Sequence, residues 1–293
     1  MQRNEILKVL RKIDVLPTFP AVMAEVISVI NDPMSSAADL AKTMDPSMAS
    51  EVLRVANTAY FGTRSFRTIT SIEHAIAIIG LRPLSQIILH MPFLSMMNGV
   101  GPQDTKKFIR HSTICAITSQ VVSQTLRIGD PHAVYIGGLM HDIGAIVLYR
   151  YFHTQWQVIS GLVRENGYTR VQAEEEVLKC DHGMIGACLL EMWNIPQSVS
   201  DGVMYHHSPG NAAENAWNAK IIDAGNRFAK QADLSDRFTN FDDFVRNNKH
   251  LVPLVEKLGF EASLCEELRL YEEVYALMKN ARPLLTATGE EQE

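Results

Sequence analysis

Histidine and aspartate side chains gather in the middle of this chain, between positions 111 and 223. Imidazole and carboxylate groups together suit borderline divalent ions such as Zn, Fe, Mn or Ni, and suit calcium or an all-thiolate site less well. The sequence therefore predicts metal chemistry in this region, centred on the adjacent pair His141 and Asp142. The residues considered as ligands are His111, His132, His141, Asp142, His153, His182, His206, His207 and Asp223.

His141 and Asp142 are neighbours on a predicted helix over residues 131–150, which separates their side chains by roughly 100° around the axis. They could therefore contact one ion or two neighbouring ions. The other candidates fall on different predicted helices, which is how a helical bundle builds a metal site in its core. Spacing alone also fits a structural role, because a buried histidine is more often satisfied by a backbone hydrogen bond than by a metal.

Apolar residues recur at helical spacing along almost the whole chain, and alternating strand-like runs are scarce. This pattern predicts an all-α fold. Pro46 and Asp104 are typical of helix beginnings, whereas Gly80 is typical of a helix end. A first helix is marked by apolar residues near position 10, and acidic helices follow position 235. The other predicted helices cover 20–30, 36–44, 46–57, 71–80, 104–126, 131–150, 155–166, 170–178, 182–193, 197–206 and 212–231.

The clearest break in the chain falls near residues 99–103, and the sequence changes to charged, acidic helices after about position 235. We therefore predict three parts. An N-terminal helical part covers 1–100, a histidine-bearing helical bundle covers 101–235, and a C-terminal helical extension covers 236–293. We see no internal repeat and no low-complexity tract.

Composition excludes several classes of protein. The chain has 293 residues and a formal charge of −6, so it lacks the basic excess expected of a protein that clamps nucleic-acid phosphates. No run approaches roughly eighteen apolar residues, and the N-terminus lacks the pattern of a signal peptide. We therefore expect a cytoplasmic protein with no nucleic-acid or membrane partner. The four cysteines form no C-x-x-C pair and are predicted to be reduced thiols.

Residues Gly138 to Gly144, with the sequence GLMHDIG, resemble the HD motif of the HD superfamily of metal-dependent phosphohydrolases. Further histidines and aspartates match, in residue type and in their order along the chain, the metal ligands of one branch of this superfamily. That branch has enlarged sites for two metal ions and includes the HD-GYP cyclic-dinucleotide phosphodiesterases. The resemblance implies a site for one or two divalent transition-metal ions (Fe, Mn, Zn or Ni). The metal ligands that it implies are His111, His141, Asp142, His182, His206, His207 and Asp223.

A narrower resemblance covers about residues 12–230. Its motifs are similar to the N-terminal half of HDOD domains, which are HD-related output modules of bacterial signalling proteins. The resemblance implies an HD-type helical bundle packed on an N-terminal helical bundle. It also implies a regulatory module that acts through protein partners of a signalling pathway in the bacterial cytoplasm. The motifs are LPTFP at 16–20, MDPS at 44–47, LRVAN at 53–57 and SIEHAIAIIG at 71–80.

Two departures from the HD-GYP pattern bear on catalysis. Ala145 follows Gly144 where those enzymes carry a lysine, and the stretch after His207 contains no GYP segment. Because both substrate-gripping elements are absent, we expect no catalytic residue and a metal with a structural or vestigial role. The competing interpretation is a metal-dependent phosphohydrolase that acts on a phosphate ester such as a nucleotide, with Arg150 as a substitute cation.

Other residues are expected to have ordinary structural roles. His74 and His90 are predicted to be packing residues, and His132 and His153 are predicted to be surface or helix-end histidines. The methionine-rich run over 91–97 favours a core helix over a groove for a partner, although methionine side chains can adapt to either.

Overall fold

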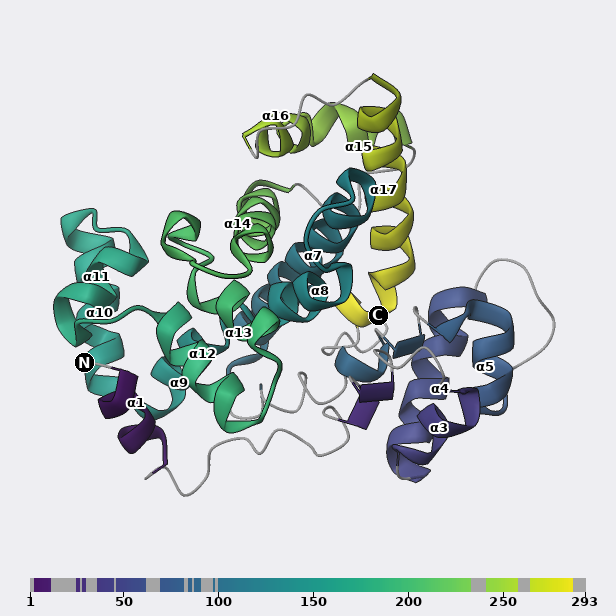
Figure 1. Cartoon of the computed structure of the whole chain (residues 1–293), viewed down its shortest axis with the longest axis horizontal. Helices are drawn as coiled ribbons and strands as arrows, with labels where there is room; N and C mark the ends of the chain where they lie inside the picture. The colour runs from purple at the N-terminus through teal and green to yellow at the C-terminus, as the bar shows by residue number, and fades with distance from the viewer. Residues whose placement is uncertain are drawn as a thin grey trace. The chain divides into compact units, whose positions relative to one another are not determined.

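The computed structural model describes residues 3–11, 25–26, 28–29, 36–44, 46–61, 69–81, 84–85, 87–90, 97, 100–232, 241–257 and 264–286. All regular elements in these ranges are helical, as Figure 1 shows, so the predicted all-α fold is confirmed. None of these helices is long and apolar enough to cross a membrane. The motif at 16–20, residues 91–96 and most of the predicted helix over 20–30 lie outside the described residues.

Two compact units make up the fold. One comprises Met1–Leu16 and Arg110–Met278, and the other comprises Pro17–Ile109 and Lys279–Glu293. We call them the ligand unit and the N-terminal unit, because every candidate metal ligand belongs to the first of them. The units join segments that are distant in sequence, so the three-part division at positions 100 and 235 stays a prediction about domain organisation.

The N-terminal unit includes the helices α3 (Ala37–Lys42), α4 (Pro46–Phe61) and α5 (Ile72–Ile79). Helix α3 begins in a capping box, in which Ser36 and Asp39 each accept the other's backbone N–H. Helices α3 and α4 both pack against α5. The Asn57 side chain accepts the backbone N–H of Ile69 at 2.8 Å and donates to its carbonyl at 2.9 Å, which ties α4 to the segment before α5.

The ligand unit is a larger helical bundle. Its helices are α1 (Arg3–Leu10), α8 (Pro131–Met140), α9 (Ile143–Tyr151), α10 (His153–Asn166), α11 (Arg170–Leu178), α12 (His182–Met192), α13 (Gln197–Met204), α14 (Ala216–Gln231), α15 (Phe241–Asn247) and α16 (Leu251–Glu256). It also contains α7 (Pro102–Leu126) from Arg110 onward and α17 (Leu264–Thr286) as far as Met278. Helix α12 contacts α1, α9 and α13, and α8 contacts α13 and α14. Helices α10 and α11 pack against each other and lie side by side in Figure 1.

Helix α7 runs through the interior of the ligand unit. Its residues 112–123 are all buried, so the helix has no solvated face over about three turns. Two helices approach its backbone through glycines. A Cβ on Gly138 of α8 would lie 2.8 Å from the Ala116 Cα, and one on Gly225 of α14 would lie 2.8 Å from the Cys115 carbonyl oxygen. These approaches place α7 against helices that carry other candidate ligands.

The predicted helix over 131–150 is interrupted at the candidate metal pair. Helix α8 ends at Met140, α9 begins at Ile143, and His141 and Asp142 form the turn between them. Asp142 has φ −97° and ψ 10°, which is outside the α-helical region. The prediction of one continuous helix was wrong, and the two side chains project from a bend rather than from a regular helix face.

A close helix crossing follows this turn directly. A Cβ on Gly144 of α9 would lie 2.0 Å from the carbonyl oxygen of His182 and 2.8 Å from the amide nitrogen of Gly186, both in α12. Only glycine permits two backbones to approach so closely. The crossing brings His182, the first residue of α12, next to Asp142.

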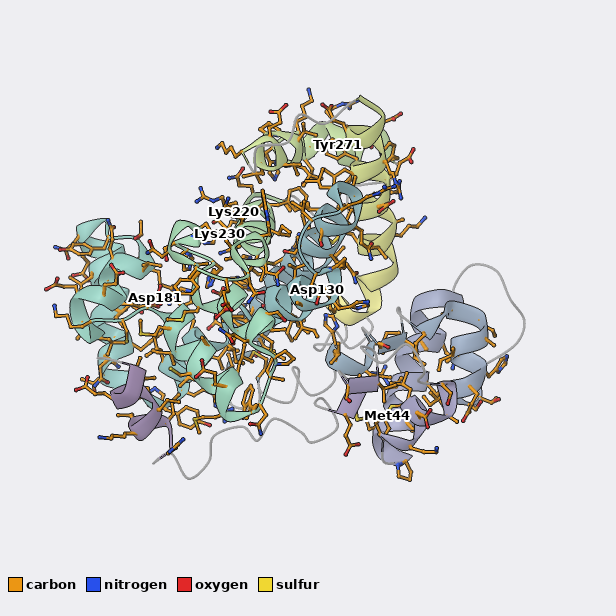
Figure 2. All side chains as sticks on the ribbon, viewed as in Figure 1. Met44, Asp130, Asp181, Lys220, Lys230 and Tyr271 are labelled. Atoms are coloured by element: carbon orange, nitrogen blue, oxygen red, sulfur yellow. The ribbon has the colours of Figure 1, made fainter. Side chains whose placement is uncertain are left out.

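Capping side chains fix where the helices around the candidate site begin. Asp130 and Asp181, both labelled in Figure 2, accept backbone N–H groups in the first turns of α8 and α12. Thr169 and Gln172 form a capping box at the start of α11. An N-cap sets the first residue of its helix and therefore the face on which each later residue lies. The predicted starts at 131, 170 and 182 agree with the structure.

Aromatic rings connect the C-terminal helices of the ligand unit. The Phe244 ring of α15 lies 6.4 Å from the Tyr271 ring and 5.2 Å from the Tyr275 ring, both on α17. The Tyr271 hydroxyl, labelled in Figure 2, donates to the carbonyl oxygen of Asn248 at 3.1 Å. The Phe244 and Tyr271 rings meet edge to face, which stabilises the helix pair beyond the area that it buries.

Candidate metal centre

Asp142 is shared by two groups of candidate ligands. On one side, the Nε2 atoms of His111 and His141 lie 3.6 and 3.2 Å from Asp142 Oδ2. On the other side, the Nε2 atoms of His182 and His206 lie 3.0 and 3.9 Å from Asp142 Oδ1. In each group the ligand atoms all lie within 4.8 Å of one another. The two oxygens of one carboxylate therefore face two separate sets of imidazoles.

Imidazole nitrogens also face each other inside each group. The Nε2 atoms of His111 and His141 are 3.1 Å apart, and those of His182 and His207 are 2.9 Å apart. Such a pair needs a proton or a metal ion between its lone pairs. We define the first ligand group as His111, His141 and Asp142, and the second ligand group as Asp142, His182, His206 and His207.

Hydrogen bonds at Nδ1 orient the three most buried rings. The His141 Nδ1–H donates to the carbonyl oxygen of Gly138 at 2.8 Å, and the His206 Nδ1–H donates to that of Val203 at 2.6 Å. The third ring, that of His182, donates to a buried carboxylate. A histidine whose Nδ1 donates can offer its Nε2 to a metal, so these three rings are arranged as ligands.

The buried carboxylate is Glu174, which the sequence predictions missed. Its Oε2 accepts the backbone N–H of His182 at 2.8 Å and the Nδ1–H of the same residue at 2.6 Å. A signal was present in the sequence, because Glu174 lies one turn before the buried Leu178 on α11, whereas Glu175 and Glu176 face solvent. A carboxylate on the apolar face of a helix requires a partner.

The charged groups of the centre shift one another's pKa values. Burial opposes the charged form of His182, but hydrogen bonds to Asp142 and Glu174 outweigh it and raise the His182 pKa to about 9. Burial lowers the pKa of His111 to about 4 and that of His207 to about 3. Burial also opposes ionisation of Asp142, yet the surrounding histidines hold its pKa well below the usual value. The metal-free centre therefore pairs an ionised Asp142 with a protonated His182.

The residues of the centre fit a divalent transition metal. The Nε2 atom of His206 is buried and has no hydrogen-bond partner. Burial, reinforced by neighbouring imidazoles, holds the His206 pKa well below its usual value, so the ring is neutral. A buried, unpartnered nitrogen of this kind costs free energy unless something binds it. Five imidazoles around one carboxylate form a donor set typical of Zn, Fe, Mn or Ni.

Asp223 lies outside both ligand groups, whereas the other six predicted ligands fall within them. Its two carboxylate oxygens accept from Arg227 Nε at 2.8 and 2.9 Å. Asn226, on the same helix, lies close enough to His111 to oppose the lowering of its pKa by burial. Asp223 therefore lies on the helix that borders the first ligand group, but its carboxylate is engaged by an arginine.

A cation also lies near the centre on α14. Lys230, labelled in Figure 2, adds to the effect of burial in lowering the pKa values of His111 and His207. Arg150, which the sequence offered as a substitute for the missing lysine, stacks over the Tyr151 ring at 5.4 Å. Lys230 is thus a cation that sequence reasoning missed, because it follows the HD motif by almost ninety positions.

The histidines predicted to have structural roles lie outside both ligand groups. His132 is the second residue of α8 and His153 is the first residue of α10, so both are helix-end histidines. His90 is buried and His74 is half-buried in the N-terminal unit. Three of the cysteines are buried free thiols, as predicted: Cys115, Cys180 and Cys188.

The fold and the site together define an all-helical HD-type protein with a histidine and aspartate centre. A family model for the HDOD domain matches residues 16–209, which is well over half of the chain. The match includes both ligand groups. The chain belongs to the HDOD domain family.

Solved structures share this fold. An HDOD domain protein of unknown function from Geobacter sulfurreducens has a TM-score of 0.75 and 20% identity, covering 99% of this chain and 98% of that chain. A proposed phosphohydrolase from Shewanella amazonensis SB2B has a TM-score of 0.64 and 22% identity, covering 92% and 98%. A relative from Treponema pallidum (strain Nichols), named as an uncharacterized protein, is 22% identical over 208 residues, or 69% of this chain. The match spans 40% of that relative's length.

Proposed function

We propose that this chain is a regulatory module of bacterial signalling that holds one or two divalent transition-metal ions and acts in the cytoplasm through protein partners. The observation that carries the proposal is the position of Asp142 between the two ligand groups. One of its oxygens lies 3.2 Å from His141 Nε2, and the other lies 3.0 Å from His182 Nε2. A carboxylate placed in this way suits a bridge between two ions.

Each ligand group would hold one ion. A bound ion would supply Lewis-acid chemistry toward an anion. Three of the rings that would hold the ions are shielded from solvent, since His141 and His206 are fully buried and His182 is nearly so. We retain Asp223 as a proposed ligand of the first group, because it lies on α14, the helix on which Asn226 lies close to His111.

The two departures from the HD-GYP sequence pattern support a regulatory role over a catalytic one. Ala145 offers a methyl group where a lysine would meet a phosphate, and the segment after His207 forms a short 3₁₀ turn over Pro209–Asn211. Phosphodiester cleavage needs groups that hold the whole phosphate, and a misplacement of about 1 Å can cost on the order of a hundredfold in rate.

An activity assay tests this proposal. Metal-reconstituted protein would be incubated with cyclic dinucleotides, cyclic mononucleotides and an aryl phosphodiester, beside the Asp142→Ala variant as a blank. We expect no turnover above the blank, because the ions alone do not hold a substrate in reacting geometry. Turnover by the wild type that disappears in Asp142→Ala would contradict the regulatory role and establish an enzyme.

The second candidate function is a metal-dependent phosphohydrolase, and the position of Lys230 favours it. A cation near enough to His111 and His207 to lower their pKa values could hold a phosphate beside the ions. If the assay finds turnover, Lys230→Ala should lower it at least tenfold. Lys220→Ala is the matched control, because Lys220 lies on the same helix but stacks over the Trp217 ring at 4.5 Å.

A further inference from the structure

Glu174 is a buried carboxylate whose hydrogen bonds go to one candidate ligand. Its side chain is completely buried in α11, and its Oε2 accepts both the backbone N–H and the Nδ1–H of His182. Its Oε1 is also buried and has no hydrogen-bond partner. A buried carboxylate is costly to the fold unless its interactions compensate. The compensation observed here comes from His182.

His182 differs in this respect from the other two oriented rings. His141 and His206 each donate their Nδ1–H to a carbonyl oxygen three residues earlier, within the same turn of chain. Those hydrogen bonds form locally and involve neutral acceptors. His182 instead donates its Nδ1–H to a carboxylate oxygen of Glu174, which lies on a different helix. A carboxylate partner fixes the ring and raises the basicity of its ligand nitrogen more than a carbonyl does.

The orientation of His182 controls contacts on the metal-facing side of its ring. Its Nε2 lies 3.0 Å from Asp142 Oδ1 and 2.9 Å from His207 Nε2. Rotation of the ring about its side-chain bonds would break both contacts at once. The hydrogen bond from Nδ1 to Glu174 opposes that rotation and also selects the tautomer with a free Nε2 lone pair once its proton is lost.

We propose that Glu174 is a positioning residue for the second ligand group, which fixes the ring of His182 so that its Nε2 can share an ion with His206 and His207. The inference rests on the proposed function, since it requires a metal at the centre. It predicts a selective effect. Changes at Glu174 should weaken the ion held by the second ligand group and spare the ion held by the first.

Cobalt titration of three variants tests this role. Glu174→Gln keeps the side-chain volume and one hydrogen-bond acceptor but removes the negative charge. Glu174→Ala removes the volume, the acceptors and the charge. Glu175→Gln is the matched control, because this neighbour is exposed on the same helix. Co²⁺ would be titrated into metal-free full-length protein, with d–d absorption and a competing chelator giving ions per chain and a Kd for each ion. Urea unfolding without metal reports whether each variant folds.

We expect the second ion to bind about tenfold more weakly in Glu174→Gln and up to about a hundredfold more weakly in Glu174→Ala, with the first ion and Glu175→Gln unchanged. Wild-type affinity for every ion in folded Glu174→Gln would overturn the inference, as would an equal loss of both ions, which would indicate a merely structural role. If Glu174→Ala does not fold, Glu174→Gln decides. A wild type that binds no cobalt would instead overturn the proposed function.

Discussion

Asp142 is the residue on which the two ligand groups depend, because each group contains it and each of its oxygens faces a different pair of histidines. Its position in the turn between α8 and α9 frees its side chain from the direction that a helix would impose. Each of the surrounding histidines belongs to only one ligand group: His111 and His141 to the first, and His182, His206 and His207 to the second. Removing one histidine should therefore affect one ion rather than both.

His206→Ala should lower the metal content of the protein without abolishing it. The variant removes one ligand of the second group and leaves the first group intact. Elemental analysis after reconstitution should show a loss of up to one ion per chain relative to the wild type. His132→Ala is the control, since His132 lies at the start of α8 and outside both groups. Unchanged content in His206→Ala would indicate that His206 is structural.

At the scale of helices, the centre depends on how closely backbones cross. His182 stands next to Asp142 because α9 and α12 meet at Gly144, where a Cβ would lie 2.0 Å from a carbonyl oxygen of α12. Side chains of ordinary size would separate these helices and pull the second ligand group away from Asp142. The glycine after the HD pair is thus part of the site, although it binds nothing.

Gly144→Ala should destabilise the protein by at least about 2 kcal/mol, because overpacking against backbone cannot be relieved by a rotamer change. Gly161→Ala is the matched control. Gly161 lies inside α10 and a Cβ there meets nothing within 4 Å, so alanine should stabilise the helix by roughly 0.5–1 kcal/mol. Urea unfolding measures both. Equal, small effects from the two substitutions would contradict the close crossing of α9 and α12.

The sequence predicts those features of the helices that depend on nearby residues. The starts of α8, α11 and α12 agree with the structure because Asp130, Thr169 and Asp181 cap them locally. The break at His141 and Asp142 was missed, since apolar periodicity continues across it and the crossing that accompanies it involves a distant helix. Local pattern carries no information on such tertiary contacts.

The candidate site shows the same limit. The order of the HD-superfamily motifs along the chain predicts which histidines lie around Asp142, because members of a family place the same motifs at the same positions of the fold. It does not predict that Asp223 is engaged by Arg227, which depends on side-chain rotamers on α14. It also does not single out Glu174 from its two acidic neighbours, which only the helical spacing of Glu174 from the apolar Leu178 distinguishes in the sequence.

For the molecule as a whole, the centre makes the free energy of unfolding depend on pH. The unfolded histidine pKa is about 6.5. Below that value His111 and His207, with folded pKa values of about 4 and 3, take up protons in the unfolded chain only. Acid therefore favours unfolding. Above that value His182, with a folded pKa of about 9, keeps a proton in the folded protein only, and this stabilisation is lost as the pH rises through 9.

The metal-free protein should therefore be most stable near pH 6.5 and less stable on both sides. Urea unfolding of chelator-treated protein at pH 5, 6.5 and 9 measures this. In Glu174→Gln the loss on the alkaline side should be smaller, because the His182 pKa is raised partly by Glu174. Stability that rises steadily from pH 5 to 9 would be inconsistent with a protonated His182 in the folded state.

The central claim is that the histidine and aspartate centre binds divalent metal, and elemental analysis of protein purified without added metal tests it most directly. The wild type should carry a substantial fraction of at least one Fe, Mn, Zn or Ni ion per chain, and Asp142→Ala should carry almost none, because both ligand groups lose their shared carboxylate. Native-state ligands also add stability by mass action, so the metal-loaded wild type should melt at a higher temperature than the stripped protein. A wild-type protein that is free of metal and takes up none of these ions when they are added would contradict the claim.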